Sequence, residues 1–369
     1  MKRSGPLSGV RIIELASIGP GPFCGMLLAD LGAEVVVIDR PQGAYALYGL
    51  DPQKDFMNRG KRSVVLDLKK PDDVEKALRL IAKADAVIEG SRPGVAERLG
   101  VGPEACMARN PALVYGRITG WGQTGPYAQW AGHDIDYIAI SGALHMCGRP
   151  GEAPAIPMNF VGDMGGGGML LAFGMAAALF EARGSGKGQV VDAAMIEGAA
   201  AQMAGMLVVR ANGQIGDERG DNTSCGVAPF YDTYQTADGK YLAVGAIEPQ
   251  FYRAFLAGLE LNGDPQLTEQ GDRALWPAQK ARIAARIRER DRDDWMATFS
   301  SEACVAPVLS PAEVEHHPQN AARGVYFRDG DVLQPAPVPK FSRTPGAVAS
   351  APPERGVDTE AVFREWLGG

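Results

Sequence analysis

Histidine, cysteine and aromatic residues are all scarce in this 369-residue chain. It contains four histidines, five cysteines and 7% aromatic residues. The cysteines are scattered and never form a C-x-x-C pair, so neither a disulfide framework nor a zinc site is indicated. The loop GPGP at 19–22 lacks the G-x-G-x-x-G spacing, and no G-x-x-x-x-G-K-[ST] occurs. NAD and ATP are therefore disfavoured as ligands, and no metal is expected.

An excess of basic charge is also missing. The net charge is −7 and the sequence pI is about 5.3, which argues against a general surface for nucleic acid or for an anionic membrane. The first 100 residues are the exception, with 15 Lys and Arg against 13 Asp and Glu. A ligand that carries phosphate is therefore expected to bind the N-terminal part.

Long hydrophobic runs are absent too. The longest uncharged stretch, between Asp163 and Glu181, has 17 residues and predicts a buried core helix instead of a membrane span. The N-terminal sequence MKRSGPLSGVRIIEL is interrupted by Arg11 and Glu14, so it is not interpreted as a signal peptide. With the scattered cysteines, these features favour a cytoplasmic protein without membrane partners.

Apolar, β-branched runs alternate with stretches of helical spacing along the first half of the chain. Strands are predicted at 10–17, 34–41, 63–68, 85–90 and 113–120, and helices at 71–84, 94–100 and 167–183. This alternation predicts an α/β protein whose large domain has a parallel, Rossmann-like sheet. Ligands of such sheets bind beyond the carboxyl ends of the strands.

The pattern changes in the second half. Residues 228–248 read as two strands around an Asp-Gly turn, and 274–299 reads as charged helix. A smaller α+β domain is therefore predicted at 226–318. The helix-like piece 358–367 at the end of the Pro-rich tail is expected to dock on the first domain.

The four histidines can be weighed singly. His316 and His317 lie in a polar string and are interpreted as solvated, whereas His145 has apolar neighbours and is interpreted as a packing residue. His133 stands between Gly132 and an aspartate, where it could cap a helix or transfer protons near neutral pH. Both interpretations of His133 remain open from spacing alone.

Asp163 is the second candidate, because it precedes four glycines at the predicted start of an apolar helix. An aspartate there is often only a helix cap. Four glycines are costly in backbone entropy, however, which favours close approach of a ligand to exposed N–H groups. Such groups would suit a thioester oxygen that becomes an enolate.

Basic residues gather around the predicted loop ends. Arg40, Lys69, Arg92 and Arg98 are among them. Most such side chains only form a solvated face, but a few at strand ends make a plausible phosphate site.

Nine separated motifs, in order, resemble the family III CoA-transferases, and within that family the group of α-methylacyl-CoA racemases. They include DLGAEVVVIDRP, NRGKRSVVLDLK, GRITGWGQTGP, GHDIDYIA, NFVGDMGGGGM and GKGQVVDAAM. The resemblance runs from about residue 5 into the tail. It implies an interlocked homodimer, with a large domain at 1–193 completed by 336–369, and linkers at 194–225 and 319–335.

The resemblance also implies roles for particular residues. Asp163 is shared by both chemistries of the family, whereas His133 fits the racemase pattern G-H-D. Asn159 and Glu248 fall where racemases have supporting residues. Glu248 of one subunit is expected to meet His133 and Asp163 of the other. Contacts to CoA are implied for Arg40, Leu66, Asp67, Leu68, Lys69, Gly90, Ser91, Arg92 and Arg98, and for Gly132, His133, Asp134, Ile135, Asp136 and Tyr137.

The implied reaction inverts C2 of a 2-methylacyl-CoA thioester by proton transfer through an enolate, with His133 on the 2S side and Asp163 on the 2R side. No separate cofactor is implied, because CoA is part of the substrate. A CoA-transferase with Asp163 as covalent nucleophile is the alternative enzyme. A catalytically silent acyl-CoA binding protein is a third hypothesis.

Overall fold

Two groups of residues pack mainly among themselves in this computed structural model, which describes residues 3–42 and 51–368. The first unit combines 1–143, 157–203 and 324–369, and the second combines 144–156 and 204–323. This grouping assigns the predicted linker residues to one unit or the other. The domain and linker boundaries inferred from the sequence therefore stay predictions.

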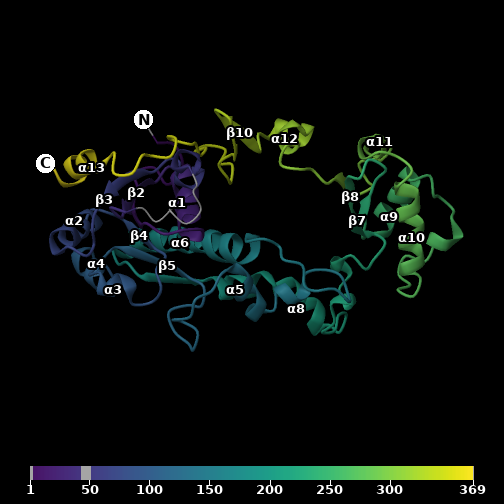
Figure 1. Cartoon of the computed structure of the whole chain (residues 1–369), viewed down its shortest axis with the longest axis horizontal. Coiled ribbons are helices and arrows are strands. Elements are labelled where there is room, and N and C mark those ends of the chain that lie inside the picture. The colour runs from purple at the N-terminus through teal and green to yellow at the C-terminus, as the bar shows by residue number, and fades with distance from the viewer. Residues whose placement is uncertain (1–2, 43–50, 369) are drawn as a thin grey trace. The chain divides into compact units, whose positions relative to one another are not determined.

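The first unit is built on a six-stranded sheet in the order β3-β2-β1-β4-β5-β6, with every neighbouring pair parallel (Figure 1). Its strands are β1 Arg11–Leu15, β2 Glu34–Asp39, β3 Arg62–Val65, β4 Ala86–Glu89, β5 Val114–Thr119 and β6 Val190–Ala194. The strand order runs one way from β1 to β3 and the opposite way from β4 to β6, so the topological switch point lies between β1 and β4, which is where ligands of doubly wound folds bind. The predicted α/β fold with a Rossmann-like sheet is confirmed.

Helices cover both faces of this sheet. Successive side chains of each strand point to opposite faces of the sheet. Ile12 of β1 therefore belongs to the core on one face and Ile13 to the core on the other. On the first face lie α1 Pro20–Asp30, α5 Asp134–Ser141, α6 Leu170–Ser185 and α7 Met195–Gln202. On the second lie α2 Pro71–Ile81, α3 Val95–Arg98, α4 Pro103–Arg109 and α13 Thr359–Leu367. Buried Val362 and Trp366 anchor α13, which confirms the docking expected for the tail.

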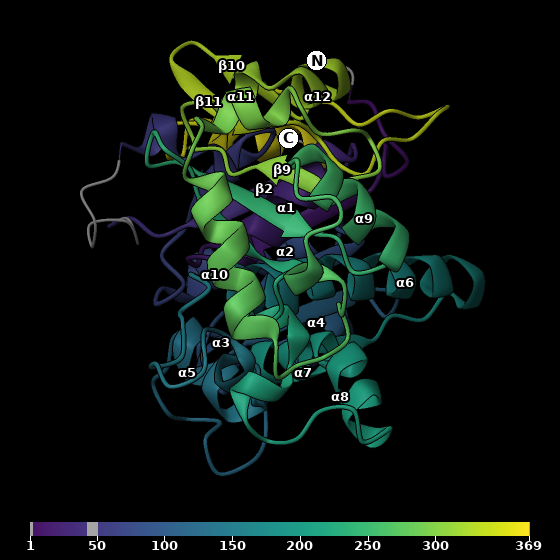
Figure 2. The ribbon, with the colours of Figure 1, turned by 90° about the vertical axis from the view of Figure 1, so that its right-hand side faces the viewer.

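The second unit has its own small sheet and core. Antiparallel strands β7 Tyr231–Gln235, β8 Tyr241–Gly245 and β9 Val305–Pro307 pair in that order. Helices α9 Pro249–Gly258 and α10 Trp276–Ile287, which can be followed in Figure 2, share one hydrophobic core with β7 and β8. The remaining elements are α8 Ala204–Ala211, α11 Arg292–Met296 and α12 Pro318–Arg323, with the hairpin β10 Tyr326–Asp329 and β11 Val332–Pro335 returning to the first unit. The predicted hairpin turn at Asp238–Gly239 is confirmed.

The apolar helix predicted at 167–183 begins earlier than expected. A π-helix runs over Phe160–Met169 and continues directly into α6. Asp163 therefore lies inside a helix and not before one. The four glycines 165–168 also lie within the π-helix, where two other helices press closely against it.

Close packing explains the small residues of the π-helix. A Cβ on Gly166 would lie 2.8 Å from the Ala199 nitrogen of α7, and a Cβ on Gly168 would lie 2.8 Å from the Pro20 carbonyl of α1. The facing Gly198 of α7 is tighter still, because its Cβ would lie 1.9 Å from the Gly166 carbonyl oxygen. These glycines let three helices approach one another, so the entropic cost is offset by packing.

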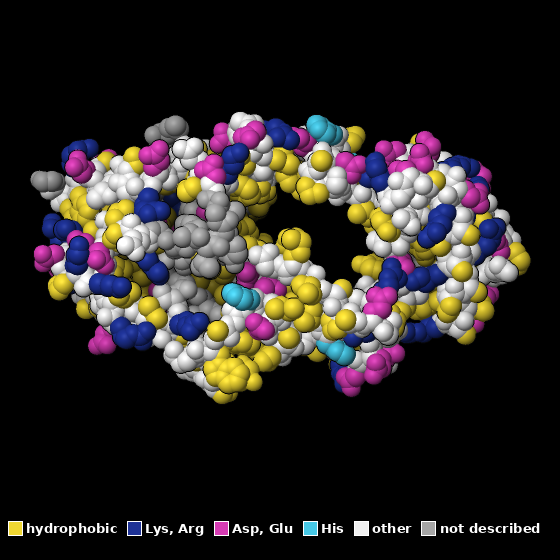
Figure 3. Space-filling view, viewed as in Figure 1, with side chains coloured by type: hydrophobic (Ala, Val, Ile, Leu, Met, Phe, Trp, Pro, Cys, Tyr) yellow, Lys and Arg dark blue, Asp and Glu magenta, His cyan; other side chains and the backbone are white. Residues whose placement is uncertain are grey.

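The expectation of a buried core helix is met on one side of α6 only. Leu171, Met175 and Leu179 are buried against the sheet, whereas Phe173 and Phe180 are 73% and 83% exposed. By length and composition the continuous helix Phe160–Ser185 is also long and apolar enough to cross a membrane. Hydrophobic side chains reach the surface at several places (Figure 3).

We expect Gly198→Ala to destabilise the first unit, because the added methyl group meets backbone that cannot rotate away. Overpacking of this kind costs about 1–3 kcal/mol. Gly184→Ala is the matched control, since Gly184 is also helical but a Cβ there meets nothing within 4 Å. It should be neutral or gain up to about 1 kcal/mol. Calorimetry measures the melting midpoints of the two variants. Equal midpoints would contradict the claim that close helix packing requires Gly198.

Candidate active site

His133 and Asp163 are brought to the starts of two neighbouring helices. His133 is the N-cap of α5, and its backbone N–H donates to Asp136 Oδ2 at 2.9 Å. Its side chain is exposed in the single chain. The capping interpretation of His133 is therefore correct for its backbone, and the imidazole is left to face solvent or a ligand.

Asp163 is held by the residue that follows His133. The Asp163 backbone N–H donates to Asp134 Oδ1 at 2.6 Å. The first N–H groups of a helix lack carbonyl partners within it, so this carboxylate acts as a cap supplied by another helix. Gly162 makes the approach possible, because a Cβ there would lie 2.5 Å from the same oxygen.

The surroundings of the Asp163 carboxyl group raise its pKa. Burial is the largest cause, and the negative charge of Asp134 acts in the same direction. A side-chain hydrogen bond with Asn159 and the charge of His133 partly offset the rise. Asn159 is the N-cap of the π-helix, so it lies where it can hold the carboxylate. These interactions bring Asp163, Asn159, His133 and Asp134 into one cluster.

A turn from the sheet borders this cluster. Gly19 caps α1 with φ 70, and a Cβ on it would lie 3.8 Å from Asp163 Oδ2. The GPGP loop therefore leads from the carboxyl end of β1 to the Asp163 carboxylate. The four glycines of the π-helix, in contrast, pack against α1 and α7. Gly166, Gly167 and Gly168 are buried, so the expectation that all four glycines expose N–H groups to a ligand is wrong.

Six of the residues for which CoA contacts are implied line one cavity of about 690 Å³. It lies beyond the carboxyl ends of β1, β2 and β3 and against α3. Ala16 and Ile38 form part of its apolar wall. The six residues are Arg40, Leu66, Asp67, Leu68, Lys69 and Arg98.

The other implied contacts occupy the loop after β4 and the start of α5. The Ser91 N–H donates to Glu89 Oε1 at 2.6 Å, which fixes the Gly90–Arg92 turn. The Tyr137 hydroxyl donates to the Gly132 carbonyl oxygen. Burial raises the pKa of Tyr137 to about 12, Asp163 adds to the rise, and the charge of Arg92 opposes it. Tyr137 thus feels the charges of both Arg92 and Asp163.

The remaining candidates lie in the second unit. Glu248 is the exposed N-cap of α9, and its expected role stays a prediction. His145 is exposed, with Nε2 2.8 Å from the Asp217 carbonyl oxygen, so its interpretation as a packing residue among apolar neighbours is wrong. His316 is exposed, as expected, and lies 3.6 Å from Glu315. In the described ranges, no group of three or more His, Cys, Asp or Glu is arranged to hold a metal ion.

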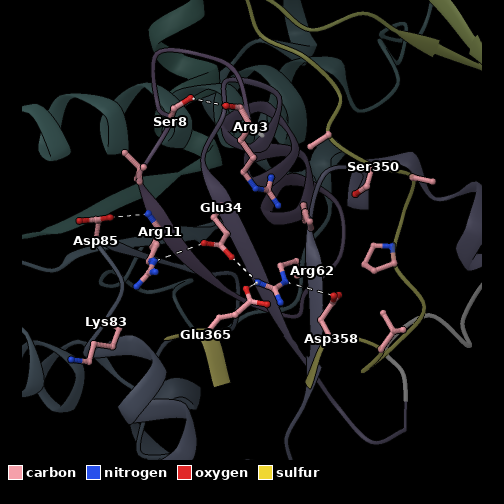
Figure 4. A pocket seen from close by; sticks show the side chains of 17 residues that line it. Arg3, Ser8, Arg11, Glu34, Arg62, Lys83, Asp85, Ser350, Asp358 and Glu365 are labelled. Atoms are coloured by element: carbon pink, nitrogen blue, oxygen red, sulfur yellow. Dashed lines mark hydrogen bonds and ion pairs between the residues drawn. The ribbon is translucent and has the colours of Figure 1, made fainter. Parts of the chain in front are cut away.

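A cavity of about 1150 Å³ lies elsewhere, at the amino ends of the strands (Figure 4). Arg62 lies within it between three carboxylates, 2.8 Å from Glu34, 2.8 Å from Glu365 and 3.6 Å from Asp358 (Figure 4). These pairs join the tail helix α13 to the edge of the sheet. The cavity therefore serves the docking of the tail and is separate from the His133–Asp163 cluster.

One buried ion pair was not foreseen from the sequence. Glu89 and Arg117 form a buried ion pair at the carboxyl ends of β4 and β5, with Nε 3.0 Å from Oε2. An arginine inside the apolar strand sequence LVYGRITG was the signal that could have identified it, because a buried guanidinium requires a partner.

Comparison with known proteins gives a consistent result. The family model described as CoA-transferase family III matches residues 7–359. The α-methylacyl-CoA racemase of Mus musculus is 44% identical over 364 residues, which cover 98% of this chain and 93% of the mouse protein. The protein of the same name from Homo sapiens is 42% identical over 363 residues, with 98% and 93% coverage. A crystal structure of a CAIB/BAIF family protein from Brucella suis matches with a TM-score of 0.84 at 27% identity, covering 99% of this chain and 100% of that chain.

The raised pKa of Asp163 predicts that Asp163→Asn stabilises the protein at neutral pH. The folded state binds the Asp163 proton more tightly than the unfolded state does, so ionisation costs stability above the folded pKa. The amide removes this cost. The advantage of the variant should shrink as the pH falls through the folded pKa towards the ordinary value of aspartate. Denaturant unfolding at a series of pH values measures the difference.

Asp329→Asn provides the control, because Asp329 is an exposed carboxylate of the same unit. Its effect should be small at every pH. A stability difference between Asp163→Asn and the parent protein that does not depend on pH would show that the environment of Asp163 is not as described.

Proposed function

Because this chain belongs to CoA-transferase family III, we propose that it is an α-methylacyl-CoA racemase, which interconverts the 2R and 2S forms of a 2-methylacyl-CoA thioester. The observation that carries the proposal is the cluster itself. An imidazole and a carboxyl group of raised pKa stand at the starts of two helices that one carboxylate joins. The relatives of Mus musculus and Homo sapiens that match almost the whole chain carry the same name.

Two proton transfers on opposite faces of C2 make up the proposed reaction. From the 2R form, the Asp163 carboxylate takes the C2 proton, and the electron pair of the C–H bond moves onto the thioester oxygen. Protonated His133 then returns a proton to the opposite face. The 2S form reacts in reverse, with neutral His133 as base and protonated Asp163 as acid. The raised pKa of Asp163 favours this exchange of roles, because both of its forms become accessible nearer to neutral pH.

The enolate needs positive potential close to its oxygen. In our proposal the positive end of the α5 helix dipole, at the helix start that carries His133, supplies part of it. Each well-aimed hydrogen-bond donor to such an oxygen is worth about 3–4 kcal/mol to a transition state. Asn159 would orient the Asp163 carboxylate.

CoA would occupy the cavity at the carboxyl ends of β1, β2 and β3. Arg40, Lys69 and Arg98 line it and are natural partners of its phosphate groups. The thioester end would pass the 90–92 turn and reach Gly132 and His133 at the start of α5. No additional cofactor is needed in this scheme, because the chain supplies both proton-transferring groups.

We also propose an interlocked homodimer, in which Glu248 of the partner subunit completes the site and tunes His133. The exposed phenylalanines of α6 support a protein partner, because single chains seldom leave such large apolar side chains uncovered. Five free cysteines among the described residues support a reducing, cytoplasmic location. The net charge of −7 supports the absence of nucleic-acid and anionic-membrane partners.

Incubation of a 2-methylacyl-CoA in deuterium oxide tests this function. We expect deuterium at C2 together with inversion, from either starting form. His133→Ala and Asp163→Asn should each lower the rate of inversion by at least about 100-fold, since each removes one proton-transferring group. Any residual exchange should favour the 2R form in His133→Ala and the 2S form in Asp163→Asn. Mass spectrometry with chiral separation measures both quantities.

His316→Ala is the matched control, because His316 is an exposed histidine remote in sequence from the cluster. It should leave the rate unchanged. Absence of exchange in the parent protein, together with a hydroxylamine-sensitive adduct on Asp163, would instead establish a CoA-transferase. A protein that binds acyl-CoA and catalyses neither reaction would be the silent binding protein.

A further inference from the structure

Glu89 occupies an unusual position for a carboxylate. It ends β4 and is 0% exposed. Its Oε1 accepts the Ser91 N–H at 2.6 Å, and its Oε2 accepts Arg117 Nε at 3.0 Å. Burial raises the pKa of Glu89, and the charge of Arg117 opposes that rise. A group so costly to bury is retained at the point where the 90–92 turn leaves the sheet.

Arg117 extends the network to a helix. Its side chain is 8% exposed and lies on β5. Besides Glu89, it contacts Glu97 of α3, with Nη1 2.8 Å from Oε1 and Nη2 3.4 Å from Oε2. One guanidinium therefore holds the 90–92 turn through Glu89 and the helix α3 through Glu97.

Both segments held by Arg117 border the proposed path of CoA. Arg98 follows Glu97 directly and lines the cavity with Val95 of the same helix. The guanidinium of Arg98 lies near Gly94, between the 90–92 turn and α3, since a Cβ on Gly94 would be 3.2 Å from Arg98 Nη1. The position of Arg98 therefore depends on how α3 is held against the sheet.

We propose that Glu89, Arg117 and Glu97 are positioning residues that set the affinity of the site for the CoA part of its ligand. This inference rests on the proposed use of CoA. None of the three would contact the reacting carbon. Their effect would be exerted through the backbone of Ser91 and through the side chains of Arg92 and Arg98.

The 90–92 turn has little freedom to move if the contacts of Arg117 with Glu89 and Glu97 are lost. A Cβ on Gly90 would already lie 3.0 Å from Ser17 Oγ, so the turn is packed tightly against the end of β1. A second tether, from Gln129 Nε2 to the Pro93 carbonyl oxygen at 3.2 Å, holds the residue after Arg92. If the contact between Arg117 and Glu97 is lost, residues 90–93 cannot move to compensate. We therefore expect α3 to shift and Arg98 to be displaced with it.

Titration with free CoA tests the inference without requiring catalysis. Glu97→Gln keeps the size of the side chain and removes its charge, and Glu97 is half-exposed, so the variant should fold. We expect the Kd for CoA to rise about tenfold, the effect of weakening a charge-assisted hydrogen bond. With a racemisable substrate, KM should rise by a similar factor while kcat stays the same. A residue that serves only stability would not produce this split.

Glu75→Gln is the matched control. Glu75 also accepts two hydrogen bonds from one arginine, Arg109, at 3.1 and 2.7 Å, and is exposed to a similar degree, 50% against 44%. Its contacts lie between α2 and α4, away from the cavity. The Kd for CoA should not change in this variant.

Arg117→Lys gives a second readout. Lysine keeps the positive charge, but its single ammonium group cannot bond the Glu89 and Glu97 carboxylates with the geometry of the planar guanidinium. Its Kd should rise at least as much as in Glu97→Gln. The inference is overturned if the parent protein does not bind CoA, or if Glu97→Gln keeps the Kd of the parent within about twofold. If the parent protein binds CoA, Glu97→Gln weakens binding and no C2 exchange occurs, the positioning role stands and the proposed function fails.

Discussion

The hydrogen bond from the Asp163 N–H to Asp134 Oδ1, at 2.6 Å, is the contact on which the candidate site depends. It joins the starts of two helices, and each of these starts carries one of the two candidate groups. The same carboxylate also raises the pKa of Asp163 through its charge. A single side chain therefore fixes where the carboxyl group lies and favours its protonated form, which is the combination that a reversible acid and base needs.

Small residues allow this contact to exist. Gly162 admits the Asp134 carboxylate, and Gly166 and Gly168 admit α7 and α1. The π-helix that contains them is held on several sides, so its irregular geometry is maintained by packing. Irregular helical turns of this type often occur at functional sites, and here the irregular turn carries Asp163.

Two buried ion pairs hold segments of the first unit in place. Lys61 is paired with Glu14 at 2.7 Å and donates to the Pro22 carbonyl oxygen at 3.0 Å, which holds the turn beside Asp163. Glu89 and Arg117 hold the turn at 90–92. Buried pairs are costly compared with apolar packing, so their value lies in the fixed position that they give to loops. These pairs tie the first turn of α1 and the 90–92 turn to the sheet.

Much of this fold was predictable from local sequence, and part of the site was not. The alternation of strands and helices, and the position of Arg40 and Lys69 after strands, follow from local pattern and from the geometry of parallel sheets. The π-helix was missed, because its form depends on Gly198 and Asp134, and Asp134 lies 29 residues from Asp163. His145 was misjudged for the same reason, since its partner Asp217 is 72 residues away. Contacts between distant residues are not encoded in a local pattern.

The arrangement of the two groups around the reacting carbon is tested most directly by a crystal structure with 2,2-dimethylacyl-CoA, which has no hydrogen at C2 and cannot react. The account predicts an imidazole nitrogen of His133 and a carboxylate oxygen of Asp163 on opposite faces of C2, each about 3–4 Å from one of its methyl groups. Both groups on one face of C2, or either side chain turned away from the thioester, would contradict it.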